Sequence, residues 1–302
     1  MAALEKAIEH FEQAVHVDPR YAPAHVGIAD SYSLLHFYDA GPPMQFYYRA
    51  KSAATKALEI DDGLAEAHAS LGNILLLYDW DWPAAERELK RAVELAPNSS
   101  EAHHAYSTYL SAVGRSTEAI QELELALALD PVSLPLNAGL GVMFYFARQY
   151  GNAIQQHLKT IDLDASFAPV HAFLGWAYAH LGLHEHAIAA CQRAMSLADA
   201  PWMLASLGFI HAMAGHRLAA EEVLDQLKER ATRGYVSAYD LALAYAAAGN
   251  RAQALAHLDA AYRERSGLLI WGLRDDPRLD DIRGEPAFGE LVRRVGFAPG
   301  AR

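Results

Sequence analysis

The sequence predicts an all-α protein in which helical hairpins are stacked side by side as a solenoid. The first observation behind this prediction is a repeat close to 34 residues long, which is typical of stacked hairpins. The second is that small and large side chains return at fixed repeat positions, and the third is that glycines recur between the helices. The period is read from pairs spaced by 35, 34, 34, 33 and 34 residues: Leu71-Gly72, Tyr106-Ser107, Leu140-Gly141, Leu174-Gly175, Leu207-Gly208 and Leu241-Ala242.

The two helices of each hairpin are predicted from residues that share this period. A small side chain lets the helices approach each other, and a large residue one turn later fills the space between hairpins. Alanines of the second helix and the residues four positions later are Ala85, Ala119, Ala153, Ala187, Ala220 and Ala254, with Leu89, Leu123, His157, Cys191, Leu224 and Leu258. The first helix is predicted to stop at Gly114, Gly182, Gly215 and Gly249, because glycine suits a left-handed helix end.

One repeat shows the whole pattern: it contains His103, Tyr106, Ser107, Leu110, Gly114, Ala119, Leu123, Ala126 and Pro131. This pattern resembles the tetratricopeptide repeat (TPR). The resemblance implies a right-handed superhelical α-solenoid whose first helices line a concave surface. It also implies a scaffold that binds proteins or peptides.

The repeats divide the chain into three predicted parts. Residues 1–19 match the second helix of a truncated TPR, residues 20–266 form seven TPR hairpins, and residues 267–302 form a C-terminal capping segment. We expect each hairpin to touch only its neighbours. The chain thus begins in mid-repeat, which predicts a helix with an unpaired apolar face. A homodimer is expected to form through that face, which consists of Leu4, Ile8, Phe11 and Val15.

Composition limits the partners. The formal net charge is −12, from 25 basic and 37 acidic residues, which argues against direct nucleic-acid binding by this segment because phosphate contacts need clustered Lys and Arg. No apolar run approaches the roughly 20 residues of a membrane span. No signal segment opens the chain, so we expect a cytoplasmic protein. The single cysteine, Cys191, is predicted to be a small buried hydrophobe, with a reactive thiol as the alternative.

The sequence predicts no catalytic residue, no cofactor and no metal, and therefore no enzyme. His25, His68, His103 and His171 occupy one repeat position, which predicts a structural role. Phosphate loops, nucleophile elbows and paired Cys motifs are absent. Acidic pairs such as Asp275-Asp276 and Asp280-Asp281 are predicted to be solvated turns. The competing hypothesis is a metal-dependent enzyme that uses His180, His184 and His186.

The position of a residue within its repeat identifies the side chains expected on the concave wall. From the fourth hairpin onward these are aromatic, apolar or small, which predicts a groove for an extended or helical peptide. The alternative is that they pack against one another. The predicted peptide-binding groove consists of Asn73, Val142, Tyr145, Phe146, Trp176, His180, Trp202, Phe209, Met213, Tyr239 and Leu243. Asn73 alone matches the set by which some TPRs grip a terminal carboxylate, and no inner Lys or Arg accompanies it.

Three stretches indicate a narrower resemblance. They are residues 78–82 (Tyr-Asp-Trp-Asp-Trp), residues 262–266 (Tyr-Arg-Glu-Arg-Ser) and the closing residues 276–296. Together they are similar to the C-terminal TPR arrays of bacterial signalling proteins that carry a winged-helix domain, a nucleotide cyclase or a serine/threonine kinase. The first functional hypothesis is a non-catalytic scaffold that holds a protein segment in its groove. The second is the ligand-sensing regulatory half of such a regulator or signalling enzyme.

Overall fold

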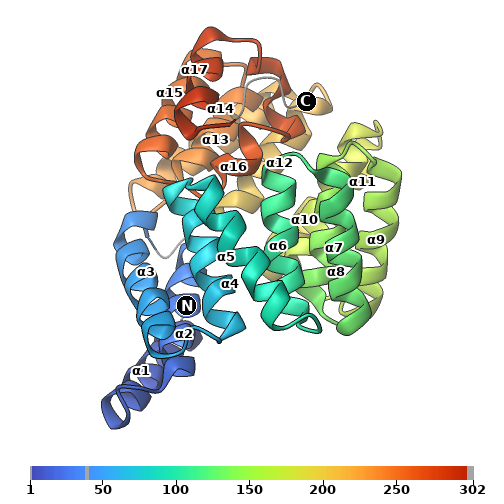
Figure 1. Cartoon of the computed structure of the whole chain (residues 1–302). Coiled ribbons are helices and arrows are strands. Elements are labelled where there is room, and N and C mark those ends of the chain that lie inside the picture. The colour runs from blue at the N-terminus through green and yellow to red at the C-terminus, as the bar shows by residue number, and fades with distance from the viewer. Residues whose placement is uncertain (1, 38–40, 298–302) are drawn as a thin grey trace.

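The computed structural model describes residues 2–37 and 41–297, and every regular element in these ranges is helical (Figure 1). The last residues of the predicted cap, 298–302, lie outside them. The elements are α1 (Ala2–Val17), α2 (Ala22–Phe37), α3 (Pro43–Ile60), α4 (Ala65–Ile74), η1 (Leu75–Asp79), α5 (Trp82–Leu95), α6 (Ser100–Ala112), α7 (Ser116–Leu129), α8 (Leu134–Phe146), α9 (Tyr150–Leu163), α10 (Ala168–His180), α11 (His184–Leu197), α12 (Pro201–Met213), α13 (Arg217–Ala231), α14 (Ala238–Ala247), α15 (Arg251–Arg263), α16 (Leu269–Gly272), η2 (Pro277–Ile282) and α17 (Pro286–Val295).

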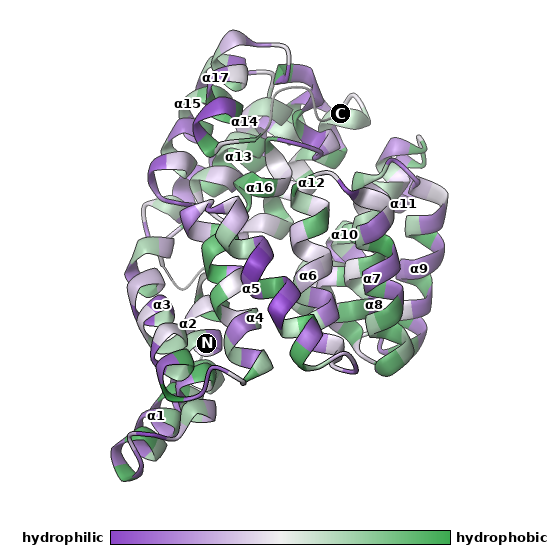
Figure 2. Ribbon diagram, in the orientation of Figure 1, coloured by the Kyte–Doolittle hydropathy of each residue, from purple (hydrophilic) through white to green (hydrophobic). Residues whose placement is uncertain are grey.

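The helices form a solenoid of hairpins, as the period predicts. From α2 to α15 each even-numbered helix pairs with the next odd-numbered one, and each odd-numbered helix also packs on the first helix of the following hairpin. The first helices α8, α10 and α12 contain no Asp, Glu, Lys or Arg, whereas their partners α9, α11 and α13 do. In Figure 2, α8 is accordingly mostly hydrophobic, while hydrophilic stretches mark α9. The first helices therefore lie inside, between the second helices and the centre of the molecule.

Helix ends follow local sequence rules. Asp81 accepts a hydrogen bond from the Ala84 amide at 3.1 Å and so caps α5, whose second residue is Pro83. The predicted glycine stops are confirmed, because Gly114, Gly182, Gly215 and Gly249 have φ between +73° and +81°. A side chain at any of these glycines would meet the strain of the left-handed region.

The four periodic histidines bond the loop that precedes each hairpin. Each ring Nε2 lies 2.9 to 3.2 Å from the carbonyl oxygen six residues earlier; the pairs are His25–Pro19, His68–Asp62, His103–Pro97 and His171–Ala165. Because a carbonyl oxygen can only accept, Nε2 carries the proton. Asn137 makes the same bond to Pro131 in the fourth hairpin. The structural reading of these histidines is confirmed.

The first full hairpins and the last helices also meet, so the array closes on itself. Trp80, at the turn between η1 and α5, stacks on Tyr262 of α15 with 5.1 Å between ring centroids. The Arg265 guanidinium lies 4.4 Å from the Trp80 ring centroid, and Trp82 Nε1 donates to the Val295 carbonyl at 3.1 Å. Figure 1 shows the C-terminal helices beside α5 accordingly. The expectation that each hairpin touches only its neighbours is therefore wrong.

Three residues other than glycine adopt positive φ within the described ranges: Trp80 at 55°, Arg148 at 62° and Arg265 at 57°. Trp80 and Arg148 occupy the repeat position that Gly114 and Gly182 fill elsewhere. For such side chains this conformation costs roughly 1–2 kcal/mol. All three make contacts across the closed array, and we infer that these contacts offset the strain.

The structure corrects the prediction for helix α1. Its predicted self-association face is not free, because α1 packs along α2. Ile8 is buried, and Leu4, Phe11 and Val15 are half-buried against the same core. Phe11 fills the space beside Gly27 of α2, where a Cβ would lie within 2.4 Å of the ring. The stated reason for a homodimer therefore does not hold.

Candidate partner-binding site

The inner wall of the solenoid is crossed by the chain's own residues 273–283, which we call the strap. The strap follows α16, includes η2 and lies against the first helices, with η2 in contact with α14. Its apolar residues Leu273, Leu279 and Ile282 are each no more than 1% exposed. Burial of this extent makes the strap part of the core.

A buried ion pair fixes the centre of the strap. Arg278 donates from Nη2 to Asp276 Oδ2 at 2.6 Å and from Nε to both carboxylate oxygens. Tyr239 Oη of α14 donates to Asp276 Oδ2 at 2.8 Å. Burial alone would raise the pKa of Asp276, but Arg278 and these hydrogen bonds hold that pKa below its ordinary value. The expectation that Asp276 lies in a solvated turn is wrong, since it is 1% exposed.

The strap is also bound to the wall by cationic groups. The Arg278 guanidinium lies 3.9 Å from the centroid of the Trp176 ring on α10, which is a cation–π contact. Arg148, directly after α8, donates from both Nη atoms to Asp280, at 2.7 and 2.9 Å. Such bidentate pairs fix orientation as well as distance.

This arrangement corrects the expectation of an open groove at the aromatic wall. Trp176 and Tyr239, predicted to bind a peptide, contact the strap instead and are no more than 5% exposed. Tyr145 and Leu243 are buried as well. These four side chains are covered within the chain, and for Trp176 and Tyr239 the strap is part of that cover, so a partner reaches those two only if the strap moves.

The other aromatic residues of the predicted wall pack among themselves. Tyr145 contacts Phe146 and Trp176, and Trp202 lies edge-on to Trp176. Phe146, Trp202 and Val142 are half-buried, as is Asn73 on α4. None of these residues lines the pocket described next. For this part of the wall, the alternative of mutual packing fits the structure.

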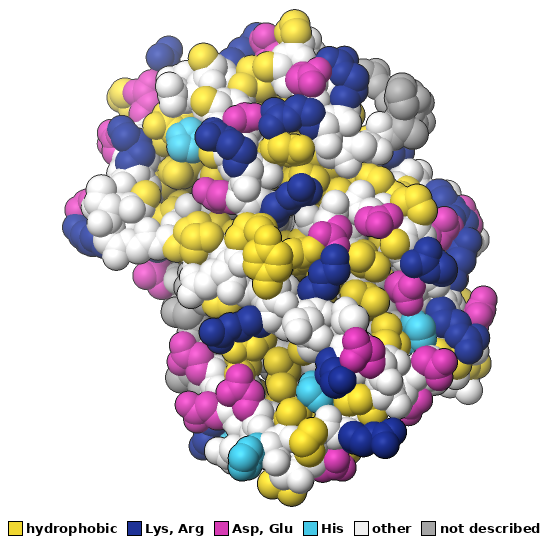
Figure 3. Space-filling view, turned by 60° about the vertical axis from the view of Figure 1, so that its left-hand side comes forward, with side chains coloured by type: hydrophobic (Ala, Val, Ile, Leu, Met, Phe, Trp, Pro, Cys, Tyr) yellow, Lys and Arg dark blue, Asp and Glu magenta, His cyan; other side chains and the backbone are white. Residues whose placement is uncertain are grey.

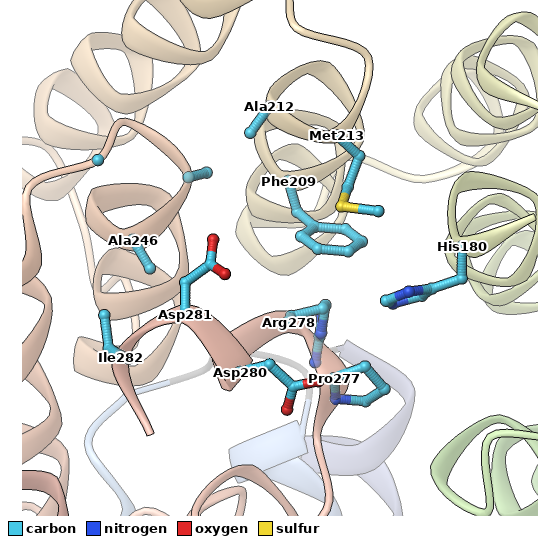
Figure 4. Close-up of a pocket in the computed structure, with 12 residues that line it drawn as sticks. His180, Phe209, Ala212, Met213, Ala246, Pro277, Arg278, Asp280, Asp281 and Ile282 are labelled. Atoms are coloured by element: carbon cyan, nitrogen blue, oxygen red, sulfur yellow. The ribbon is translucent and has the colours of Figure 1, made fainter. Parts of the chain in front are cut away.

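A pocket of about 410 Å³ remains open beside the strap (Figure 4). It lies between the C-terminal ends of α10, α12 and α14 on one side and η2 on the other. Three predicted groove residues meet there: His180, Phe209 and Met213. Met213 is 41% exposed, whereas Phe209 presents a ring that is largely covered. Part of the predicted groove is thus open to a partner at this pocket.

Charge in the pocket is unevenly compensated. Arg278 is neutralised by Asp276 and Asp280 by Arg148. Burial, together with the nearby Arg148, lowers the pKa of His180 to about 4, so its imidazole is neutral at pH 7. Its Nε2 lies 3.1 Å from Tyr145 Oη, and its ring stacks on Tyr150. Asp281 is exposed and pairs with no cation in the described ranges.

The residues that sequence reasoning missed come from the strap. Pro277, Arg278, Asp280, Asp281 and Ile282 complete the pocket, yet the sequence suggested only a terminal cap here. Within this segment the sequence drew attention to the acidic pairs Asp275-Asp276 and Asp280-Asp281, but it did not place them at a pocket. The strap lies outside the repeats, so the spacing of the repeats does not predict that it crosses the inner wall. Its location depends on how strongly the solenoid curves.

The histidines of the competing metal hypothesis do not gather. His180 packs among aromatic rings, and His186 contacts Tyr178. No group of three or more His, Cys, Asp or Glu with the arrangement of a metal site occurs in residues 2–37 and 41–297. Cys191 is buried, and its burial raises the pKa of the thiol to about 12, which disfavours the reactive thiolate.

The face of the molecule in Figure 3 shows little segregation by charge. In the view of Figure 3, Lys and Arg are interspersed with Asp and Glu, and hydrophobic side chains lie between them. No helix in the described part of the chain combines the length and the apolar character that a bilayer crossing needs.

Comparisons with known proteins agree with this architecture. A family model of the tetratricopeptide repeat matches residues 168–201, the hairpin of α10 and α11. The human protein named Tetratricopeptide repeat protein 13 is 27% identical over 108 residues, which cover 36% of this chain and 12% of that protein. The chain thus matches only a small part of that curated relative's length.

Solved structures resemble the chain over most of its length. A chain of the APC/C hetero-tetramer Cut9-Hcn1 superimposes with a TM-score of 0.63 at 17% identity, covering 97% of this chain and 52% of that one. A tetratricopeptide repeat protein from Parabacteroides merdae gives a TM-score of 0.58 at 11% identity, with 89% and 98% covered. Identities this low show the fold alone. The hairpin at residues 168–201 is thus similar to the tetratricopeptide repeat, and the array that contains it has the fold of a TPR-like solenoid.

Proposed function

We propose that this chain is a non-catalytic interaction scaffold that binds a segment of a partner protein in the pocket between η2 and the ends of α10, α12 and α14. The observation that supports this proposal is that the pocket combines an accessible apolar side chain, Met213, with a neighbouring carboxylate, Asp281, that pairs with no cation among the described residues. Concave sites with apolar anchors and a few polar groups are typical places for protein segments to bind.

The strap supports this placement in a second way. It is fixed by the buried Asp276–Arg278 pair and by the Arg148–Asp280 contact, so η2 forms a rigid floor rather than a loose cover. A preformed site loses less conformational entropy on binding than one that must be assembled. The proposed ligand therefore adds to the wall and strap as they stand.

Affinity capture from the source cell tests the function. The bait is the full chain, and the test variants are Met213→Glu, which places a charge at the apolar rim, and Ala246→Leu, which fills the pocket from α14. Leu125→Glu on α7 is the matched control, because Leu125 is 51% exposed and lies outside the pocket. We expect both pocket variants to lose a protein that the wild type and the control retain.

Cross-linking of the captured complex then locates the contact. The expected links join the partner to residues near the ends of α12 and α14. If all four baits retained the same proteins, or if the links fell on the outer helices, the pocket would not be the binding site.

A further inference from the structure

The strap carries four carboxylates, and one of them has no counterion in the part of the chain that the structure describes. Asp275 pairs with Arg274, Asp276 with Arg278 and Asp280 with Arg148. Asp281, within the ranges that the structure describes, has no Lys, Arg or His nitrogen at ion-pair distance. The arginines that flank Asp281 on the strap, Arg278 and Arg283, pair with Asp276 and Asp280.

The position of Asp281 places this charge inside the pocket. In Figure 4 its carboxylate points up from η2 into the space between Ala246 of α14 and Phe209 of α12, whereas Asp280 points the opposite way. The walls beside it are small, because Ala212 and Ala246 carry only a methyl group. Room therefore remains next to the carboxylate for a side chain from outside.

The remaining walls suit the stem of a long cationic side chain. Phe209 offers an aromatic ring and Met213 a flexible thioether, both of which pack well along methylene groups. A cation near the Phe209 ring would also gain a cation–π attraction. A pocket of about 410 Å³ is ample for one such side chain.

Other charges at the pocket do not oppose a cation. Arg278 lines the same space, but its charge is compensated by Asp276 and it lies against Trp176. His180 faces the pocket from α10 as a neutral ring at pH 7. Asp280 is held by Arg148, so Asp281 contributes the uncompensated charge.

We propose that the pocket recognises a lysine or arginine side chain of the bound protein segment, with its stem along Phe209 and Met213 and its charge at Asp281. This proposal rests on the proposed function and names the chemistry of its ligand. Charge complementarity identifies the occupant as cationic, and the apolar walls favour a side chain with a methylene stem over a small hydrated ion.

Short peptides test the recognition directly. The probe is acetyl-Ala-Lys-Ala-amide, its arginine analogue is the second probe, and the norleucine analogue, which keeps the stem and removes the charge, is the comparison. Binding is followed by the methyl resonance of Met213 in protein labelled at its methionine methyl groups, and Met213→Leu assigns that resonance. We expect the two cationic peptides to shift the Met213 signal in a saturable manner, and added salt to weaken the shift.

Two carboxylate variants provide the control. Asp281→Asn keeps the shape of the side chain at an exposed position, so the fold should be unaffected. Asp162→Asn changes an exposed aspartate on α9 that forms no ion pair within residues 2–37 and 41–297. We expect Asp281→Asn to weaken binding of the lysine peptide by about tenfold or more, and Asp162→Asn to leave it unchanged.

The outcomes separate this inference from the proposed function. Equal responses to lysine and norleucine peptides, no response to either cationic peptide, or equal binding by wild type and Asp281→Asn would each overturn the cation site. A partner that the wild type captures and Met213→Glu loses, but Asp281→Asn retains, would keep the scaffold and reject its proposed ligand chemistry.

Discussion

His157 is the residue whose replacement should change stability most informatively. It belongs to α9, its ring has no exposed surface and packs on Gly141 of α8, and neither ring nitrogen has a hydrogen-bond partner within residues 2–37 and 41–297. The same repeat position holds Leu89 in the second full hairpin, where the leucine packs on Gly72 as His157 packs on Gly141. A leucine is therefore already accommodated at the equivalent position of another hairpin, and we expect His157→Leu to be accommodated in the same way.

At neutral pH the substitution should stabilise the protein. A buried polar group without a partner costs about 1–3 kcal/mol, and leucine removes both unsatisfied nitrogens of His157. Imperfect packing against Gly141 offsets part of the gain, because a misfit in a dense core costs about 1 kcal/mol or more. We expect a net increase of about 1–2 kcal/mol in the free energy of unfolding.

The acid dependence gives a sharper test. Burial lowers the pKa of His157 from 6.5 to about 3, so below pH 6.5 the unfolded chain binds a proton that the folded chain does not. Stability from the neutral imidazole is thus intact above pH 6.5 and is lost as the pH falls toward 3. Each unit in that window costs about 1.4 kcal/mol, so the wild type should lose about 3 kcal/mol by pH 4.5 that His157→Leu retains.

Urea denaturation at pH 7.5 and pH 4.5 measures both effects, with midpoint and slope followed by far-ultraviolet circular dichroism. Other histidines, such as His180, titrate in both proteins and cancel in the difference between them. His10→Gln, at an exposed position of α1, is the control and should follow the wild type. If His157→Leu and the wild type lost the same stability between the two pH values, the assignment of a neutral buried imidazole would be wrong.

Two further perturbations concern the strap and the closure of the array. Asp276→Ala leaves the Arg278 guanidinium buried without its partner and should lower the free energy of unfolding by about 3–5 kcal/mol; thermal melts measure it, and an unchanged midpoint would contradict the buried pair. Trp80→Ala removes the ring that stacks on Tyr262 and lies beneath Arg265. Amide exchange should then accelerate in α15 and α17, whereas equal protection in the variant would show that this contact does not hold the ends together.

The hairpins could be predicted because their signals are local. Alanine at Ala119 and leucine at Leu123 face one direction on the same helix, and Gly114 ends the preceding one, so a period in sequence becomes a period in space. His103 shows the same logic, since its carbonyl partner lies six residues away in the chain. Interactions of this kind need no knowledge of the rest of the molecule.

The candidate site was predicted only in part. His180, Phe209 and Met213 were identified from repeat register and do line the pocket. Trp176 and Tyr239 were identified by the same register but lie under the strap. Register gives the side of a helix on which a residue lies, but it does not say what covers that side.

The sequence by itself determined the helices, their pairing and the inward side of each first helix, because these depend on spacings of a few residues that repeat along the chain. Only the tertiary structure decided that the ends meet and that the strap crosses the wall, leaving Asp281 beside an open pocket. The physical reason is that small rotations between successive hairpins add up over the array. Contacts such as Arg148–Asp280 join residues 132 positions apart. They depend on the total rotation along the array, which no local sequence pattern reveals.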